Sequence, residues 1–182
     1  APERRGFSEA REGSRLFYTR RIQGGRNIHA VERYLKVADA IGCRQTEVLF
    51  PFPLFRDPED IVSLKKQYPG YAVLVPGARW RTKIWPAEHF GKVAELLPVP
   101  SLIVGAEADR ERAERIVRLS RGKAVSLVGR TGLKELISVI RSARVVITND
   151  SGPMHIAAAF GVPVVALFGP TSPERTGPYG CL

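Results

Sequence analysis

The sequence predicts a doubly wound α/β domain from residue 71 onward, because short apolar segments alternate there with amphipathic segments of helical length. Strands are expected at residues 71–75, 101–104, 124–128, 144–148 and 163–168. Helices are expected at residues 86–97, 109–119, 133–142 and 152–160, where apolar residues recur at helical spacing. Several of the strands are continuous runs of Val, Ile and Leu, which is typical of parallel strands buried on both faces.

The first 70 residues lack this alternation. A helix is expected at residues 30–41 with Gly42 as its stop, and a second helix should run from Asp57-Pro58 to Tyr68. Residues 15–21 form a candidate strand, and the proline-flanked residues 51–53 are interpreted as a linker or an edge segment. We therefore assign residues 1–50 to the tail of a different unit and residues 51–182 to the α/β domain. The chain has no initiator Met, which suggests processing or origin as a piece of a longer protein.

Composition is typical of a soluble globular protein, with 44% apolar residues in a chain of 182. No apolar run is long enough to cross a membrane, and no signal-peptide core follows the basic amino terminus. The two cysteines, Cys43 and Cys181, lie far apart and have no neighbour at metal-ligand spacing. We interpret them as unpaired thiols of a cytoplasmic protein.

The formal net charge of +10 favours anionic partners such as nucleotides, phosphorylated glycans, nucleic acid or an anionic membrane surface. The sequence contains neither zinc-finger spacing nor the aromatic motif of RNA-recognition domains. We therefore expect no nucleic-acid partner.

In an open parallel sheet, ligands bind beyond the carboxyl ends of the strands, so the residues at each strand exit are candidates for a site. The first exit combines a Pro76-Gly77 turn with Ala78, Arg79 and Lys83 before a helix start, which predicts a phosphate-binding loop. The alternative is a basic surface loop anchored by Trp80 and Trp85.

The second and third exits are weaker candidates. Glu107 could accept hydrogen bonds from the hydroxyls of a ribose, or it could, with Asp109, simply complement the dipole of the next helix. Thr131, between Gly129 and Gly132, could form a wall of a base pocket or cap the following helix.

The fourth exit carries the strongest signal. Ser151 is a suitable N-cap, Gly152 exposes its amide, and His155 follows one turn into the helix, so an anion could bind there. Asp150 could accept hydrogen bonds from sugar hydroxyls. The alternative is a well-capped helix with a buried Asp and a surface His. The fifth exit, with Thr171, is either a plain turn or the closing wall of the phosphate site.

Several common motifs are absent. There is no Asp-x-Asp to hold a divalent cation, so a leaving diphosphate would be neutralised by amides and by Lys and Arg. The sequence also lacks a Walker loop, a Gly-x-Gly-x-x-Gly after any strand, and Gly-x-Ser-x-Gly. These absences disfavour P-loop, dinucleotide-binding and α/β-hydrolase functions.

Taken in order, these segments resemble the carboxy-terminal half of glycosyltransferase family 9, the ADP-heptose:lipopolysaccharide heptosyltransferases. The resemblance extends from about residue 71 to the end of the chain. It rests on Pro76-Gly77-Ala78, Lys83-Ile84-Trp85-Pro86, Gly105-Ala106-Glu107, Asn149-Asp150-Ser151-Gly152-Pro153-Met154-His155 and Phe168-Gly169-Pro170-Thr171-Ser172-Pro173.

The resemblance implies a GT-B enzyme, in which two Rossmann-like domains enclose the active site and the carboxy-terminal one binds the nucleotide sugar. It implies that Lys83 contacts the donor phosphates and sugar and that Glu107 binds the ribose. It further implies that Asp150 holds the heptose hydroxyls. Ala78 and Arg79 would line the phosphate loop, with Ser151, Gly152 and His155 at the diphosphate. Arg79 stands where some members have a hydroxyl residue.

The family reaction transfers heptose from ADP-heptose to the lipopolysaccharide inner core with inversion, and it needs no metal or cofactor. Its general base belongs to an amino-terminal domain that this sequence almost wholly lacks, so this chain alone is expected to bind donor without catalysing transfer. The expected acceptor is the core and lipid A region of lipopolysaccharide, with possible peripheral contact with the inner membrane. Two alternatives remain: a GT-B enzyme that uses a UDP-sugar, and a non-enzymatic module that binds anions or nucleic acid.

Overall fold

A five-stranded parallel sheet forms the centre of the carboxy-terminal part of the chain in the computed structural model, which describes residues 3–43, 47–53 and 55–180. Its strands are β3 (Ala72–Val75), β4 (Ser101–Ile103), β5 (Ala124–Ser126), β6 (Val145–Asn149) and β7 (Val164–Leu167). Their order across the sheet is β5-β4-β3-β6-β7. Each of the five strands predicted from residue 71 onward is present, within two residues at either end.

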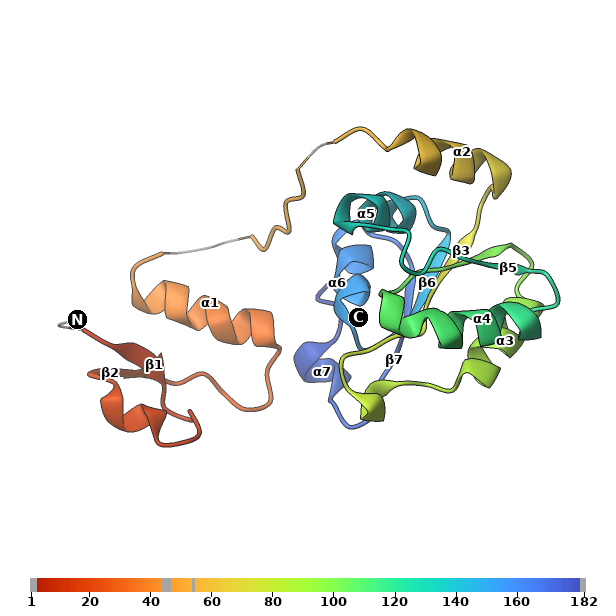
Figure 1. The fold of residues 1–182 in the computed structure, drawn as a ribbon. Helices are drawn as coiled ribbons and strands as arrows, with labels where there is room; N and C mark the ends of the chain where they lie inside the picture. The colour runs from red at the N-terminus through yellow and green to blue at the C-terminus, as the bar shows by residue number, and fades with distance from the viewer. Residues whose placement is uncertain (1–2, 44–46, 54, 181–182) are drawn as a thin grey trace.

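Helices cover both faces of this sheet (Figure 1). They are α2 (Glu59–Gln67), α3 (Ala87–Leu96), α4 (Arg110–Leu119), α5 (Leu133–Arg141) and α6 (Gly152–Ala159), and the short α7 (Pro173–Thr176) follows β7 without covering either face. The single-turn 3₁₀ helices η2 (Arg81–Lys83) and η3 (Glu107–Asp109) follow the exits of β3 and β4. This confirms the doubly wound α/β fold.

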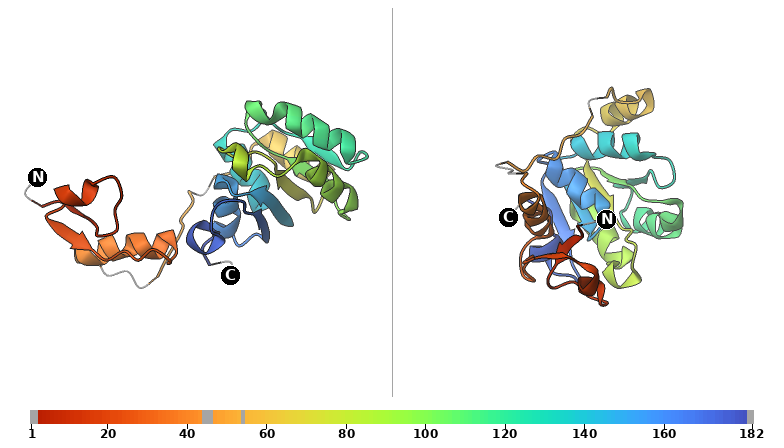
Figure 2. Two further views of the ribbon diagram at one scale, coloured as in Figure 1. Left: turned by 90° about the horizontal axis from the view of Figure 1, so that it is seen from below. Right: turned by 90° about the vertical axis from the view of Figure 1, so that its left-hand side faces the viewer.

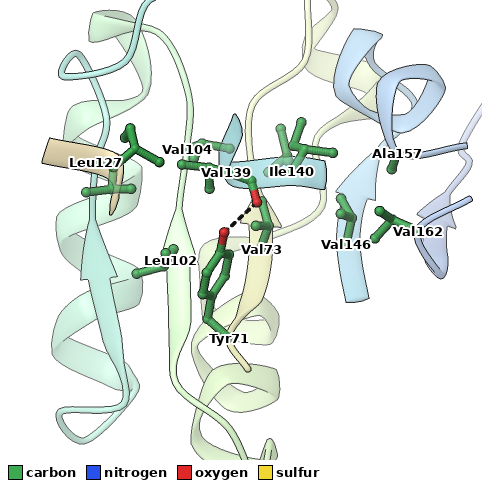
Figure 3. Close-up of a cluster of buried hydrophobic side chains, with 12 residues drawn as sticks. Tyr71, Val73, Leu102, Val104, Leu127, Val139, Ile140, Val146, Ala157 and Val162 are labelled. Carbon is green, nitrogen blue, oxygen red and sulfur yellow. Dashed lines mark hydrogen bonds between the residues drawn. The ribbon is translucent and has the colours of Figure 1, made fainter. Parts of the chain in front are cut away.

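Two hydrophobic cores lie on opposite faces of the sheet, because successive residues of a strand point to opposite sides. On one face, Val73 and Val75 of β3 pack with α5 and α6 (Figure 3). On the other, Leu74 packs with Phe90 of α3 and Ile116 of α4. The buried hydroxyl of Tyr71 donates a hydrogen bond of 2.7 Å to the Val139 carbonyl and so attaches the start of β3 to α5 (Figure 3). The strands are therefore covered on both sides, as their continuous apolar sequences predict.

Residues 3–43 form a smaller lobe beside the α/β domain (Figures 1 and 2). It contains β1 (Arg5–Phe7), the 3₁₀ helix η1 (Ser14–Phe17), β2 (Arg20–Ile22) and α1 (Ala30–Ala40). The predicted helix at residues 30–41 is confirmed, and Gly42 adopts a positive φ of 90° just after it. Within the lobe, Gly24 is the one described residue that is buried.

The candidate strand at residues 15–21 is wrong in its first half. Glu12 and Gly13 both have positive φ, and the Leu16 amide donates to the Gly13 carbonyl, so the chain turns into η1. Only Arg20–Ile22 is extended, and it pairs in parallel with β1, a strand that the sequence did not predict.

Cys43 is exposed and free, as predicted, while Cys181 lies outside the described residues. Among residues 3–43, 47–53 and 55–180, no helix has the length and apolarity that a bilayer crossing demands.

Candidate functional site

A cavity of about 570 Å³ opens at the carboxyl ends of the central strands. The chain winds from β3 toward β5 on one side and from β6 toward β7 on the other, so β3 and β6 flank the point where the winding reverses. Ligands of doubly wound domains bind at this point. Four predicted site residues line the cavity, namely Ala78, Arg79, Thr131 and Ser151.

Asp109 lies between the exits of β3 and β4 and lines the same cavity. A Cβ atom at Gly77 would come within 2.3 Å of the Asp109 Oδ2 atom, and one at Gly105 within 2.9 Å. Asp109 Oδ2 accepts a hydrogen bond of 3.2 Å from the Ala106 amide, and its Oδ1 pairs with Arg112 at 2.6 Å. The two glycines therefore make room for the Asp109 carboxylate, which is bonded to the second loop and lies against the first.

Asn149 joins the exits of β3 and β6. Its side chain donates 2.8 Å to the Pro76 carbonyl and accepts 3.1 Å from the Trp85 amide. Asn149 is fully buried, so both bonds are protected from water. Asn149 therefore fixes the loop that follows β3 against the end of β6.

Lys83 and Asp150 form an ion pair at 2.6 Å, and the Thr171 hydroxyl donates to the same Asp150 oxygen at 2.6 Å. Three strand exits therefore converge on one carboxylate. Burial would raise the pKa of Asp150, but the hydrogen bonds from Lys83 and Thr171 and the charge of Lys83 hold it below its ordinary value. Asp150 is thus a charged hydrogen-bond acceptor near neutral pH.

Ser151 occupies the N-cap position of α6, as predicted, and Gly152 is the first helical residue. The Ser151 side chain does not cap the helix, however, because its hydroxyl lies 3.0 Å from that of Thr148. The helix start, through Ser151 and Pro153, lines the cavity and offers a positive dipole end to it.

His155 lies in a second, smaller cavity of about 240 Å³ rather than in the first. It shares this cavity with His29 and Tyr179, whose rings are 4.9 Å apart. Desolvation lowers the pKa of His155, and His29 acts in the same direction while Asp150 opposes them. The neutral imidazole is therefore favoured in this structure.

Glu107 is not among the residues that line the large cavity, and the same holds for Lys83, Asp150 and Gly152. The exposed Glu107 carboxylate pairs with Arg110, with one contact of 2.6 Å. That contact lowers the pKa of Glu107.

The alternative interpretation of Thr131 as a helix cap is wrong, because Gly132 occupies the N-cap of α5.

Sequence reasoning assigned no binding role to Asp109 or Asn149, and it considered Thr171 only as part of a turn that could close the phosphate site. Asp109 was considered only for its effect on a helix dipole, and Asn149 only as part of a motif. Their positions at strand exits were the one available signal, because their contacts with other strand exits join residues 21 to 73 positions apart. Among the described residues, no three His, Cys, Asp or Glu side chains are grouped closely enough to hold a metal ion.

Comparison with known proteins places this site in a family. The model of glycosyltransferase family 9 (heptosyltransferase) matches residues 1–181. Lipopolysaccharide heptosyltransferase 1 of Pseudomonas aeruginosa is 34% identical over 171 residues, which cover 90% of this chain and 46% of that protein. The chain spans about a third to a half of the length of the curated relatives it matches.

Solved structures agree with this assignment. A family 9 glycosyltransferase from Veillonella parvula superposes with a TM-score of 0.75 at 27% identity, covering 98% of this chain and 54% of that one. An Escherichia coli heptosyltransferase with ADP-2-deoxy-2-fluoro heptose superposes with a TM-score of 0.65 at 27% identity. The match covers 94% of this chain and 56% of that one. The fold is that of a GT-B glycosyltransferase domain. Because the family model matches nearly the whole chain, this chain belongs to glycosyltransferase family 9.

Proposed function

We propose that this chain is the donor-binding half of an inverting heptosyltransferase that uses ADP-heptose. The observation that carries the proposal is the convergence of Lys83, Asp150 and Thr171 beside a nucleotide-sized cavity at the winding reversal of the sheet. The names of the relatives, and the ADP-heptose analogue held by the Escherichia coli structure, support this choice of donor.

The donor would lie across the carboxyl edge of the sheet. The nucleoside would fill the large cavity, whose wall includes Thr131, Leu133 and Leu136. The diphosphate would meet Ala78 and Arg79 on one side and Ser151 and Gly152 at the start of α6 on the other. Lys83 would complete the phosphate site. Two side chains would have to move: His155 would turn from the smaller cavity toward the diphosphate, and Glu107 would rotate away from Arg110 to bring its carboxylate to the ribose.

Asp150 would bind hydroxyls of the heptose rather than act as the general base. A general base works best with a pKa near the working pH, whereas the pKa of Asp150 is held below its ordinary value. Its pairing with Lys83 also reduces the repulsion between this carboxylate and a bound diphosphate.

In the proposed reaction, an acceptor hydroxyl attacks the anomeric carbon while the bond from that carbon to the diphosphate oxygen breaks. The hydroxyl proton passes to a general base, which we place outside these 182 residues. Lys83, Arg79 and the amides at the start of α6 would stabilise the departing ADP. We propose no metal and no cofactor for this step.

The acceptor would be the inner core and lipid A region of lipopolysaccharide. We place the whole protein in the cytoplasm, with peripheral contact with the inner membrane and no nucleic-acid partner. These assignments rest on the family and on the relatives' names.

Calorimetric titration of the chain with ADP, UDP and GDP tests the donor class. The proposal predicts that ADP binds at least about tenfold more tightly than UDP or GDP, a difference of about 1.4 kcal/mol. A preference for UDP would overturn the assignment of heptose as the sugar. Binding of generic DNA more tightly than ADP would favour the non-enzymatic alternative instead.

An ADP-release assay with a lipopolysaccharide-core acceptor tests whether this chain binds the donor without supplying the general base. The chain is expected to bind donor and to release no ADP above the acceptor-free control. Acceptor-dependent release by this chain would show that the base lies within it.

A further inference from the structure

A third cavity, strongly basic and of about 360 Å³, lies away from the proposed donor site, between the amino-terminal lobe and α7. Arg11, Arg26 and Arg33 of the lobe line it together with Arg175 of α7, and Glu9 and Asn27 complete its wall. Figures 1 and 2 show the start of α1 next to α7, so residues about 150 positions apart meet here.

The four arginines of this cavity form no ion pair with any residue that the structure describes. Among the described residues, no ion pair involves Arg11, Arg26, Arg33 or Arg175, although seven other arginines are paired. The Glu9 carboxylate accepts hydrogen bonds of 3.1 and 3.2 Å from the Gly24 and Gly25 amides, so it is held away from an ion pair with the arginines and offsets only one of their four positive charges.

Arg33 is held in place before any ligand arrives. Its guanidinium lies 4.1 Å from the centre of the Phe7 ring, and its Nε atom is buried without a hydrogen-bond partner. Gly24 permits this packing, since a Cβ atom there would come within 2.7 Å of that Nε atom. A fixed guanidinium loses less conformational freedom when it binds an anion than a mobile one.

We propose that this cavity binds a phosphomonoester group. Guanidinium groups bind phosphate oxygens in pairs of parallel hydrogen bonds, and a dianion relieves the mutual repulsion of four arginines better than a single negative charge. The group could belong to a soluble phosphorylated sugar or to a lipid headgroup, and both supply the same chemistry. The site is independent of the proposed donor site.

The test compares the unmodified chain with a cavity variant and a control variant, in a phosphate-free buffer at constant ionic strength. R26Q/R175Q removes two of the cavity arginines. R118Q/R144Q removes two exposed arginines that pair with no described residue and do not line this cavity, so the net charge of the two variants is equal. R11Q/R26Q provides a second cavity variant if the first does not fold, which amide NMR spectra will show.

Inorganic phosphate is the soluble probe, followed by the ¹H–¹⁵N signals of residues 24–27, Arg33 and Arg175. We expect saturable shifts that R26Q/R175Q weakens at least about tenfold, as loss of charge-assisted hydrogen bonds requires, and that R118Q/R144Q leaves within about twofold. Shifts elsewhere, or equal weakening by both variants, would overturn the proposal.

Co-sedimentation with phosphatidylcholine vesicles, with and without phosphatidic acid, distinguishes the two sources. Saturation by free phosphate supports a soluble phosphomonoester, whereas binding that needs phosphatidic acid and is lost selectively in R26Q/R175Q supports a headgroup. If neither probe occupies the cavity, the proposal is wrong. ADP affinity should be unchanged in R26Q/R175Q, so failure of ADP to bind the unmodified chain would overturn the donor proposal alone.

Discussion

At the scale of single residues, the site depends on positions where a side chain is excluded. The backbone conformation of Gly77 does not demand a glycine. A glycine is needed there because the Asp109 carboxylate occupies the space where a Cβ atom would lie. The sequence alone shows a Pro-Gly turn at this point but not the carboxylate 32 residues later that makes glycine necessary.

Gly77→Ala should therefore destabilise the chain by about 1–3 kcal/mol, because the new methyl group overpacks the space held by Asp109. Removing the obstacle should restore part of the loss, so G77A/D109A should be less destabilised than the sum of the single variants. Urea unfolding of the four proteins measures this coupling. Gly152→Ala is the control for stability, since a Cβ atom there meets nothing within 4 Å. Additive losses in the double variant would show that Asp109 does not impose the glycine.

Asp150 provides a prediction about the donor, which rests on the proposed function. Asp150→Ala should weaken binding of ADP-heptose at least about tenfold more than binding of ADP, because only the sugar loses a charged acceptor. ADP binding should change little, since Lys83 is released from its ion pair and remains available to the phosphates. Calorimetry with both ligands gives the two ratios. Asp39→Ala, at an exposed position on α1, controls for the loss of a negative charge. If D150A weakened the binding of ADP and of ADP-heptose equally, Asp150 would not be the residue that binds the sugar.

At the scale of secondary-structure elements, helix and strand positions follow the apolar periodicity closely, because burial on one or both faces determines that periodicity. The attachment of α2 is different. Asp57, just before α2, pairs with Lys65 of α2 at 2.7 Å and with Arg141 at the end of α5. The sequence marks Asp57-Pro58 as a helix start but contains no sign of the contact with Arg141, which lies 84 residues away.

This cluster predicts a pH dependence of stability. Burial would raise the pKa of Asp57, but the bonds from Lys65 and Arg141 lower it from 3.8 to about 2. Because the folded-state value lies below the unfolded one, the stabilisation is complete above about pH 4 and is lost as the pH falls toward 2. A shift of this size corresponds to about 2 kcal/mol.

Asp57→Asn should lower the free energy of unfolding at pH 7 by roughly that 2 kcal/mol and flatten its dependence on pH between 4 and 2. Urea unfolding at a series of pH values measures both effects. Asp60→Asn, an exposed position on the same helix, should leave the pH dependence as it is. The same slope in D57N and in the unmodified chain would contradict the role given to this cluster.

At the scale of the whole molecule, the two lobes differ in how much they bury. All the buried hydrophobic residues belong to the segment from Ile61 to Val162, whereas the amino-terminal lobe has no apolar core among its described residues. The lobe is joined to the domain by specific contacts, such as the hydrogen bond of 3.0 Å from His29 Nε2 to the Gly177 carbonyl and the ring contact between His29 and Tyr179.

Residues 51–182 should therefore fold cooperatively without residues 1–50, while residues 1–50 alone should not fold, because too little apolar surface is buried to offset the loss of chain entropy. Circular dichroism during thermal unfolding, together with amide exchange, compares the two pieces with the intact chain. Cooperative unfolding of residues 1–50, or loss of cooperativity in residues 51–182, would contradict this division of stability.

The sequence by itself determined the doubly wound fold, the positions of the strands and the strand exits where ligand groups should lie, because hydrophobic periodicity and turn residues are local properties. The tertiary structure alone decided which exit residues meet. It joined Lys83 and Thr171 to Asp150, placed Asp109 against two glycines, paired Glu107 with Arg110 and assembled four arginines around one cavity. These contacts depend on how the sheet brings distant segments together, and no local pattern of residues specifies that arrangement.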